Sequence, residues 1–171
     1  MTRTALFWSY HLESPSFRHR LRPVAEELER RGWRCELREL PRKEGNYLRR
    51  ITARSDEISA ADLMVMPYRD GASLRRGTLM AAMAHGRPLI TTTPAARTPE
   101  LVHGENVWLV PPGDAVALAA AMEALVAAPA RRDKLGAAAA VTAEQFTWDK
   151  IAARTAAFLD ALPAPRHPDV I

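Results

Sequence analysis

Short apolar runs alternate with longer stretches of helical spacing along this chain of 171 residues. The runs at 4–9, 62–67, 87–93 and 106–110 have the length and composition of buried strands, and the run at 33–40 alternates between apolar and charged residues. Regular alternation of strands and helices favours parallel strands, because each helix returns the chain to the same edge of the sheet. The sequence therefore predicts an α/β fold: a Rossmann-like parallel sheet of about five strands with flanking helices and a helical C-terminal end.

Residues with known capping preferences mark the ends of the predicted helices. Ser14 is a candidate N-cap with Pro15 at the first helical position, and Pro23 leaves a kink or a later start as alternatives. Gly32 and Gly86 occur where helices are expected to end, and Asp114 occurs where another is expected to begin. These positions predict helices that begin and end between the apolar runs.

The chain is long enough for one domain with a sizeable core, which we expect to span residues 1–163. Within it, residues 1–45 form a first strand–helix–strand unit, and the polar, basic stretch 46–60 is expected to be a connector. Residues 61–163 continue the alternation. The proline-rich residues 164–171 are expected to be a disordered tail.

Composition and spacing exclude several classes of function. The formal charge of +4 and the clustered arginines could attract nucleic acid, acidic lipid or a nucleotide, or could reflect composition alone. No aromatic platform accompanies the basic clusters, so no nucleic-acid partner is expected. One cysteine and the spacing of His85, His103 and His167 predict no metal site. With no secretory leader and no apolar window of membrane-spanning length, a cytoplasmic protein is expected, and contact with a membrane surface lacks support.

The stretch YRDGASLRRG at 68–77 follows a buried run and leads into a predicted helix. Glycines let backbone amides approach a ligand closely, hydroxyls donate hydrogen bonds, and a helix start attracts anions. Arginines add charge-assisted contacts to a diphosphate. The predicted anion-binding residues are Gly71, Ala72, Ser73, Arg75, Arg76, Gly77 and Thr78, with Asp70 as a possible additional residue of the same site. The alternative is a solvated basic loop in which Asp70 pairs locally with an arginine.

The stretch after the first predicted strand, at 10–20, offers a second set of polar residues. His11 could act as an acid or a base, or could bind an acceptor hydroxyl. Ser14 and Ser16 lie at the predicted helix start, with Arg18 and Arg20 one turn further on. The alternative is helix capping with surface arginines. Both loops follow strands of a parallel sheet, whose carboxyl ends are the usual place for ligands.

The order of these segments resembles a known family, the family 4 (group 1) glycosyltransferases of the GT-B fold. The run PELVHGENVWLVPPGD at 99–114 is the most specific part, and the similarity covers roughly residues 60–160, which resemble the C-terminal half of such enzymes. Residues 1–40 resemble the start of their N-terminal domain less specifically. The chain is therefore identified as a shortened relative, in which the start of one domain joins the later part of the other.

The resemblance implies transfer of a sugar from a nucleotide-sugar donor to an unknown acceptor, with retention of configuration and without a metal or other cofactor. It implies that the anion-binding residues hold the donor's diphosphate and that His11 polarises the acceptor or the sugar. Two departures stand out. In the family's E-x7-E motif, Ala81 replaces the second Glu, and Asp70 lies near the first Glu but out of register with it.

The absent middle of the enzyme leaves two further questions. We hypothesise that the first strand–helix–strand unit replaces the missing strands and closes one parallel sheet, with Arg18 and Arg20 facing the loop at 68–77. The alternative function is a non-catalytic remnant that binds a nucleotide, a phosphate or a partner. A homodimer or a complementary glycosyltransferase fragment would be the partner that completes the cleft.

Overall fold

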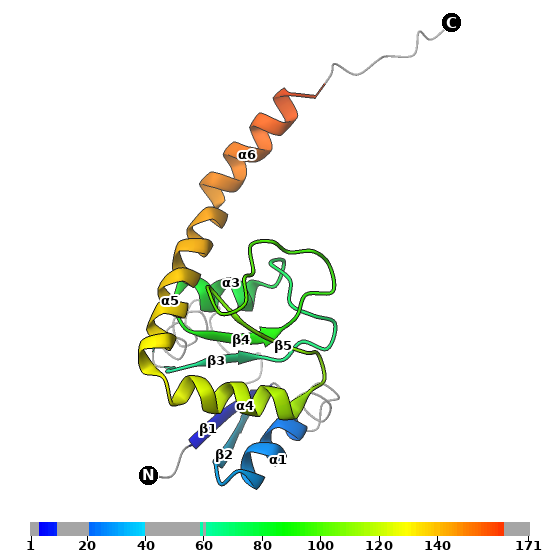
Figure 1. Ribbon diagram of the computed structural model, residues 1–171. Helices are drawn as coiled ribbons and strands as arrows, with labels where there is room; N and C mark the ends of the chain where they lie inside the picture. The colour runs from blue at the N-terminus through cyan, green and yellow to red at the C-terminus, as the bar shows by residue number, and fades with distance from the viewer. Residues whose placement is uncertain (1–3, 10–20, 40–58, 60, 163–171) are drawn as a thin grey trace, which may run out of the picture.

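A computed structural model of the protein describes residues 4–9, 21–39, 59 and 61–162 (Figure 1). Most of the predicted connector and all of the predicted tail lie outside these residues. The elements in chain order are β1 (Thr4–Ser9), α1 (Arg22–Arg30), β2 (Arg34–Glu39), β3 (Met64–Met66), α3 (Gly77–Ala84), β4 (Leu89–Thr92), β5 (Trp108–Val110), α4 (Ala115–Val126), α5 (Pro129–Ala143), the 3-10 helix η2 (Glu144–Phe146) and α6 (Trp148–Asp160). The predicted α/β fold with parallel strands is confirmed.

The strands form two separate parallel sheets instead of the single sheet that the sequence suggested. β1 pairs with β2 along its whole length, with Thr4 opposite Arg34 and Ser9 opposite Glu39. β3, β4 and β5 form a three-stranded sheet in that order. The expected single sheet of about five strands was wrong in this respect, because the first unit turns the apolar face of α1 toward the second sheet. Side-chain packing, not a backbone ladder, joins the two units in the described part of the chain.

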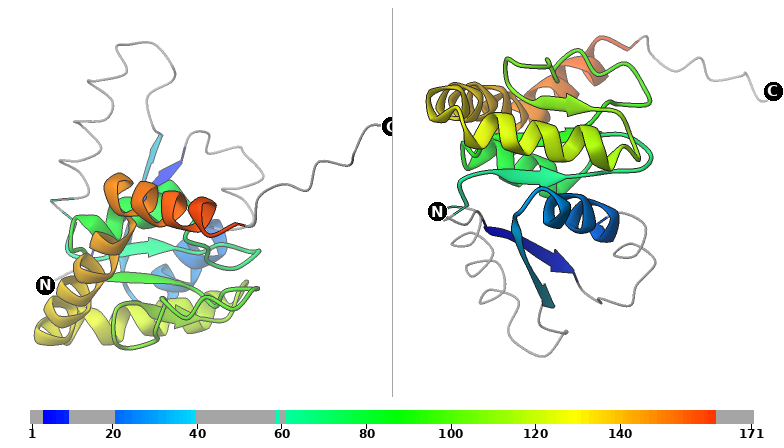
Figure 2. Two further views of the ribbon diagram at one scale, coloured as in Figure 1. Left: turned by 90° about the horizontal axis from the view of Figure 1, so that it is seen from above. Right: turned by 60° about the horizontal axis from the view of Figure 1, so that its bottom comes forward.

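Helices cover both faces of the three-stranded sheet, in three layers (Figure 2). Alternate residues of β4 point to opposite faces, so that Ile90 packs with α1 and α4 while Leu89 packs with α3 and α5. Both side chains are fully buried. The near-continuous apolar run at the centre of the sheet is thus explained by its two covered faces.

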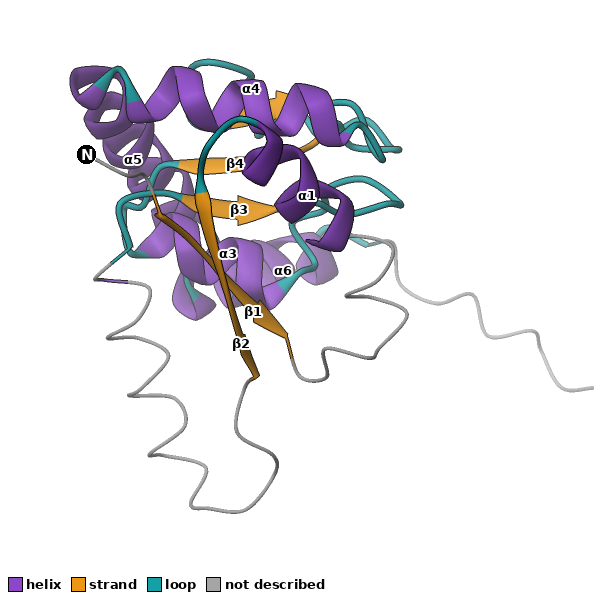
Figure 3. Cartoon of the chain, turned by 90° about the horizontal axis from the view of Figure 1, so that it is seen from below, coloured by secondary structure: helices purple, strands orange, loops and turns teal. Residues whose placement is uncertain are grey.

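The apolar face of α1 packs beside α4, as the view in Figure 3 shows. Val24 and Leu28 of α1 enter the same core cluster as Leu118 and Leu125 of α4. α1 is described from Arg22, and the predicted start at Ser14 lies outside the described residues. This contact attaches the N-terminal unit to the larger sheet.

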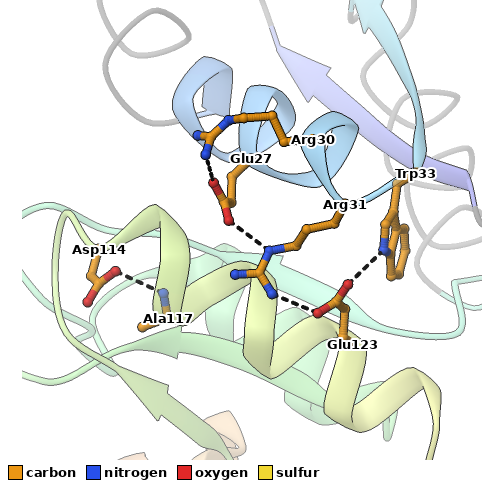
Figure 4. A network of polar contacts seen from close by, with 7 residues as sticks. All are labelled: Glu27, Arg30, Arg31, Trp33, Asp114, Ala117 and Glu123. Carbon is orange, nitrogen blue, oxygen red and sulfur yellow. Dashed lines mark hydrogen bonds and ion pairs between the residues drawn. The ribbon is translucent and has the colours of Figure 1, made fainter.

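A polar network at the end of α1 reinforces this contact (Figure 4). The Arg31 guanidinium donates to Glu27 Oε1 at 2.7 Å and to Glu123 Oε2 of α4 at 2.7 Å. The Trp33 indole donates to the other oxygen of Glu123 at 3.4 Å, and Arg30 forms an ion pair with Glu27. The hydrogen bonds that Arg31 donates to Glu27 and Glu123 raise the pKa of Arg31 above its ordinary value. The guanidinium therefore stays charged across the whole working pH range.

The ends of α4 are closed by side chains. Asp114 Oδ1 accepts a hydrogen bond from the Ala117 N–H at 2.8 Å, which confirms the predicted N-cap. At the other end, Arg132 Nη1 donates to the carbonyl oxygens of Leu125 and Val126 at 3.0 and 2.8 Å. These contacts fix the direction in which α4 leaves the sheet.

Beyond α5, the chain leaves the three-layered body along α6 (Figure 1). α6 has no buried residues, and its Trp148 is 85% exposed. Within the described ranges, no helix combines the length and the apolar composition that crossing a membrane requires.

We predict that Leu28→Ala lowers the free energy of unfolding by about 2–5 kcal/mol, because it leaves a cavity between α1 and α4. The control Val116→Ala, on the exposed side of α4, should change the stability by about 0.5 kcal/mol or less. Urea denaturation followed by circular dichroism measures both. Equal stability of the two variants would contradict the packing described here.

Candidate functional site

The carboxyl ends of β3, β4 and β5 meet at one edge of the sheet, and the loop 67–76 connects β3 to α3 at this edge. Two buried threonines of β4 hold the loop in place. Thr91 Oγ1 donates to the Met66 carbonyl at 2.8 Å, and Thr92 Oγ1 donates to the Tyr68 carbonyl at 2.7 Å. Both side chains are buried. Their hydroxyls therefore tie the loop to the end of β4.

Gly71 packs the loop against the segment that follows β4. Its backbone has a φ of +81°, and a Cβ atom there would lie 2.6 Å from the Ala95 nitrogen and 2.7 Å from the Thr93 oxygen. The neighbouring Ala72 N–H donates to the Thr92 carbonyl at 3.2 Å. Both residues are buried. Gly71 and Ala72 thus shape the loop, and the amide of Ala72 already has its acceptor inside the protein.

Arg76 is the most constrained charged residue of the loop. Its Nη2 forms an ion pair with Asp70 Oδ2, and its guanidinium carbon lies 4.1 Å from the centroid of the Tyr68 ring. The Tyr68 hydroxyl shares a hydrogen bond of 2.9 Å with Thr78 Oγ1. The predicted local pair of Asp70 with an arginine is therefore present. It holds Arg76 next to the start of α3.

The start of α3 is exposed, and among the described residues no side chain caps its first backbone amides. Arg76 occupies the N-cap position with an extended backbone, and Gly77 and Thr78 of the first turn are exposed. The first amides of a helix have no acceptor within the helix, and they carry partial positive charge. Ser73 and Arg75 lie immediately before this end, where the Arg75 N–H donates to Ser73 Oγ at 3.4 Å. The arrangement can bind an anion.

The other predicted site residues lie outside the described structure. His11, Ser14, Ser16, Arg18 and Arg20 belong to the stretch 10–20. Their expected position across from the loop therefore stays a prediction.

Two further observations concern polar groups within the described part. Ala81, where the family resemblance suggests a Glu, is partly exposed on α3 and offers no polar side chain. Across the described ranges, no three His, Cys, Asp or Glu side chains gather in a way that could hold a metal ion.

Sequence reasoning missed two features of this edge. The sequence assigned no role to Tyr68, yet this residue contacts Arg76, Thr78 and Met66. In addition, a small cavity of about 50 Å³ lies between the starts of α1 and α4. Its lining residues include Arg69, Thr92 and, from α1, Pro23 and Val24, together with Val110, Pro111, Gly113, Asp114, Ala115 and Leu118. No local pattern could reveal it, because its walls come from segments far apart in the sequence.

Among known families, the one described as glycosyl transferases group 1 matches residues 24–128. Comparison with curated proteins gave no match.

Several solved structures share the fold. HepE of Anabaena in complex with UDP has a TM-score of 0.68 and 16% identity, over 94% of this chain and 49% of that one. Sucrose-phosphate synthase of Thermosynechococcus elongatus has a TM-score of 0.62 and 21% identity, over 93% and 45%. The C-terminal domain of LpcC, a group 1 family protein of Francisella tularensis, has a TM-score of 0.55 and 15% identity, over 85% of both chains. The chain thus spans about half the length of HepE and of the synthase.

We predict that Gly71→Ala lowers the free energy of unfolding by more than Gly113→Ala does. Both glycines have a positive φ, but only at Gly71 does backbone occupy the space of a Cβ atom. The backbone conformation alone should cost about 1–3 kcal/mol in each variant, and the clash adds to this at Gly71. Thermal and urea denaturation measure the difference. Equal losses would show that the loop does not pack closely on the segment after β4.

Proposed function

Since this chain belongs to the group 1 glycosyltransferases, we propose that it is the donor-binding part of a glycosyltransferase. The donor's diphosphate lies at the loop 67–76 and the first turn of α3. Within the predicted set, Arg76, Ser73, Thr78 and the amides from Gly77 onward contact the phosphates, and Arg75 adds positive charge from the exposed side. Gly71 and Ala72 shape the loop that presents them.

The observation that carries this proposal is the position of the Arg76 guanidinium at the uncapped start of α3. Both features favour an anion, and both lie at the carboxyl edge of a parallel sheet, where α/β proteins place their ligands. Guanidinium groups bind phosphate oxygens through paired N–H donors. The loop is held by the buried threonines of β4, so its donors are already oriented when the ligand arrives.

In the proposed reaction, the bond between the sugar and the diphosphate breaks, and negative charge accumulates on the departing diphosphate. Arg76 and the amides at the start of α3 stabilise this charge more strongly than that of the intact donor. The sugar passes to an acceptor with retention. His11 is the candidate for polarising the acceptor or the sugar. Positive charge at the leaving group comes from the protein in this scheme, which calls for no cofactor.

The length of the chain supports a need for a partner. HepE, twice the length of the matched part, was crystallised with UDP-glucose, and this suggests a uridine diphosphate sugar as the first donor to test. One structurally similar chain belongs to the GtfA/B complex, with a TM-score of 0.57 and 15% identity. A complementary glycosyltransferase fragment or a second copy of this chain would supply the acceptor side. The proposed location is the cytoplasm, where a single cysteine stays reduced.

We predict that UDP binds and that Arg76→Ala weakens its binding by about 10- to 100-fold, the value of a hydrogen-bonded charge pair. Isothermal titration calorimetry measures the affinity. Uridine, which lacks the phosphates, should bind equally to both proteins. Arg131→Ala, which removes an arginine from α5, is the matched control and should bind UDP as the unchanged protein does.

Unchanged UDP affinity in Arg76→Ala would contradict the proposed site. An assay for release of UDP from a panel of UDP sugars separates the two functions. Turnover supports the enzyme. Binding without turnover, even when a complementary fragment is added, supports the non-catalytic alternative.

A further inference from the structure

Arg76 lies between an aromatic ring and a carboxylate of its own loop. The Tyr68 ring covers one face of the guanidinium at 4.1 Å, and Asp70 Oδ2 contacts Nη2. Tyr68 is tied by its carbonyl to Thr92 and by its hydroxyl to Thr78, whereas the Asp70 side chain is 66% exposed.

Asp70 uses only part of the donor edge that Arg76 presents. The Nε atom of Arg76 is buried and has no hydrogen-bond partner among the described residues. Nε and Nη2 are neighbouring N–H donors on one edge of the guanidinium, and this edge binds planar or tetrahedral oxyanions through two parallel hydrogen bonds. The carboxylate therefore makes a weaker contact than the group allows. A phosphate with two oxygens on this edge would satisfy both donors.

We propose that Asp70 competes with the donor's diphosphate for Arg76, so that its carboxylate takes the place that a phosphate takes when the donor binds. The inference rests on the proposed donor site and adds the way in which that site selects its ligand. Because the Asp70 side chain is 66% exposed, water can hydrate the carboxylate oxygen that leaves Arg76. Tyr68 keeps the guanidinium in plane during the exchange. The sequence alone suggested that Asp70 helps to bind the diphosphate, whereas in this proposal its carboxylate opposes that binding.

The competition makes the site selective among anions. An anion of one negative charge offers Arg76 no more than Asp70 already does, and it gains little from the exchange. A diphosphate brings more charge and also reaches the amides at the start of α3. The loop should therefore ignore acetate and chloride at concentrations where it binds diphosphates.

The test is the sign of the change in UDP affinity in Asp70→Asn, measured by calorimetry. Removal of the competitor should tighten UDP binding by about 2- to 5-fold, the range of exposed ion pairs. If Asp70 instead orients Arg76 for the ligand, the same variant binds UDP more weakly. Asp62→Asn is the matched control, because it removes the same charge at the opposite end of β3; it should leave the affinity unchanged.

A second pair of variants links the effect to Arg76. In the Arg76→Ala background, Asp70→Asn should leave the UDP affinity unchanged, because the contested group is absent. Thermal unfolding confirms that each variant is folded. If UDP binding also becomes tighter in Asp62→Asn, or on adding Asp70→Asn to Arg76→Ala, the effect comes from overall charge and the competition is overturned. Unchanged or weaker UDP binding in the single variant Asp70→Asn would overturn it too.

The same data separate this inference from the proposed function. If Arg76→Ala weakens UDP binding but Asp70→Asn does not strengthen it, the donor site stands and the competition fails. If UDP binds to none of the variants nor to the unchanged protein, both fail.

Discussion

Burial of one face of α1 against α4 determines how the two parts of this chain combine. Leu28 and Leu125 are fully buried in the shared core, and Arg31 joins Glu27 of α1 to Glu123 of α4 at its margin. The N-terminal unit is therefore attached through its helix, and its two strands form a sheet of their own. Because β1 and β2 do not join the sheet of β3, β4 and β5, the loops at the carboxyl edge of this sheet come from its own strands. The start of α1 contributes to the small cavity at that edge.

The loop after β3 combines a fixed base with accessible charge. Its base is held by the hydroxyls of Thr91 and Thr92 and by the close approach of Gly71 to the segment after β4. Its charged part is Arg76, oriented by Tyr68 beside the first turn of α3. Binding sites commonly place such groups on loops that a rigid sheet positions.

The sequence was sufficient to predict the alternation of elements, the N-cap at Asp114 and the helix ends at Gly32 and Gly86, which both have positive φ. These features depend on neighbouring residues. The division into two sheets does not, because periodicity shows that α1 has a buried face but not which element covers it. The sequence also did not reveal that Tyr68 lies over Arg76, because that contact depends on the conformation of the loop. The roles of His11, Ser14, Ser16, Arg18 and Arg20 stay predictions, because these residues lie outside the described structure.

The central claim is that the start of α3 and Arg76 receive a diphosphate. Amide chemical shifts of the isotope-labelled protein, followed during titration with UDP and separately with uridine, test it most directly. The account predicts that UDP shifts the amides of Gly77, Thr78 and Leu79 together with the side-chain Nε–H of Arg76, and that uridine does not. Shifts confined to another part of the chain, such as the surroundings of Trp108, or identical shifts with both ligands, would contradict it.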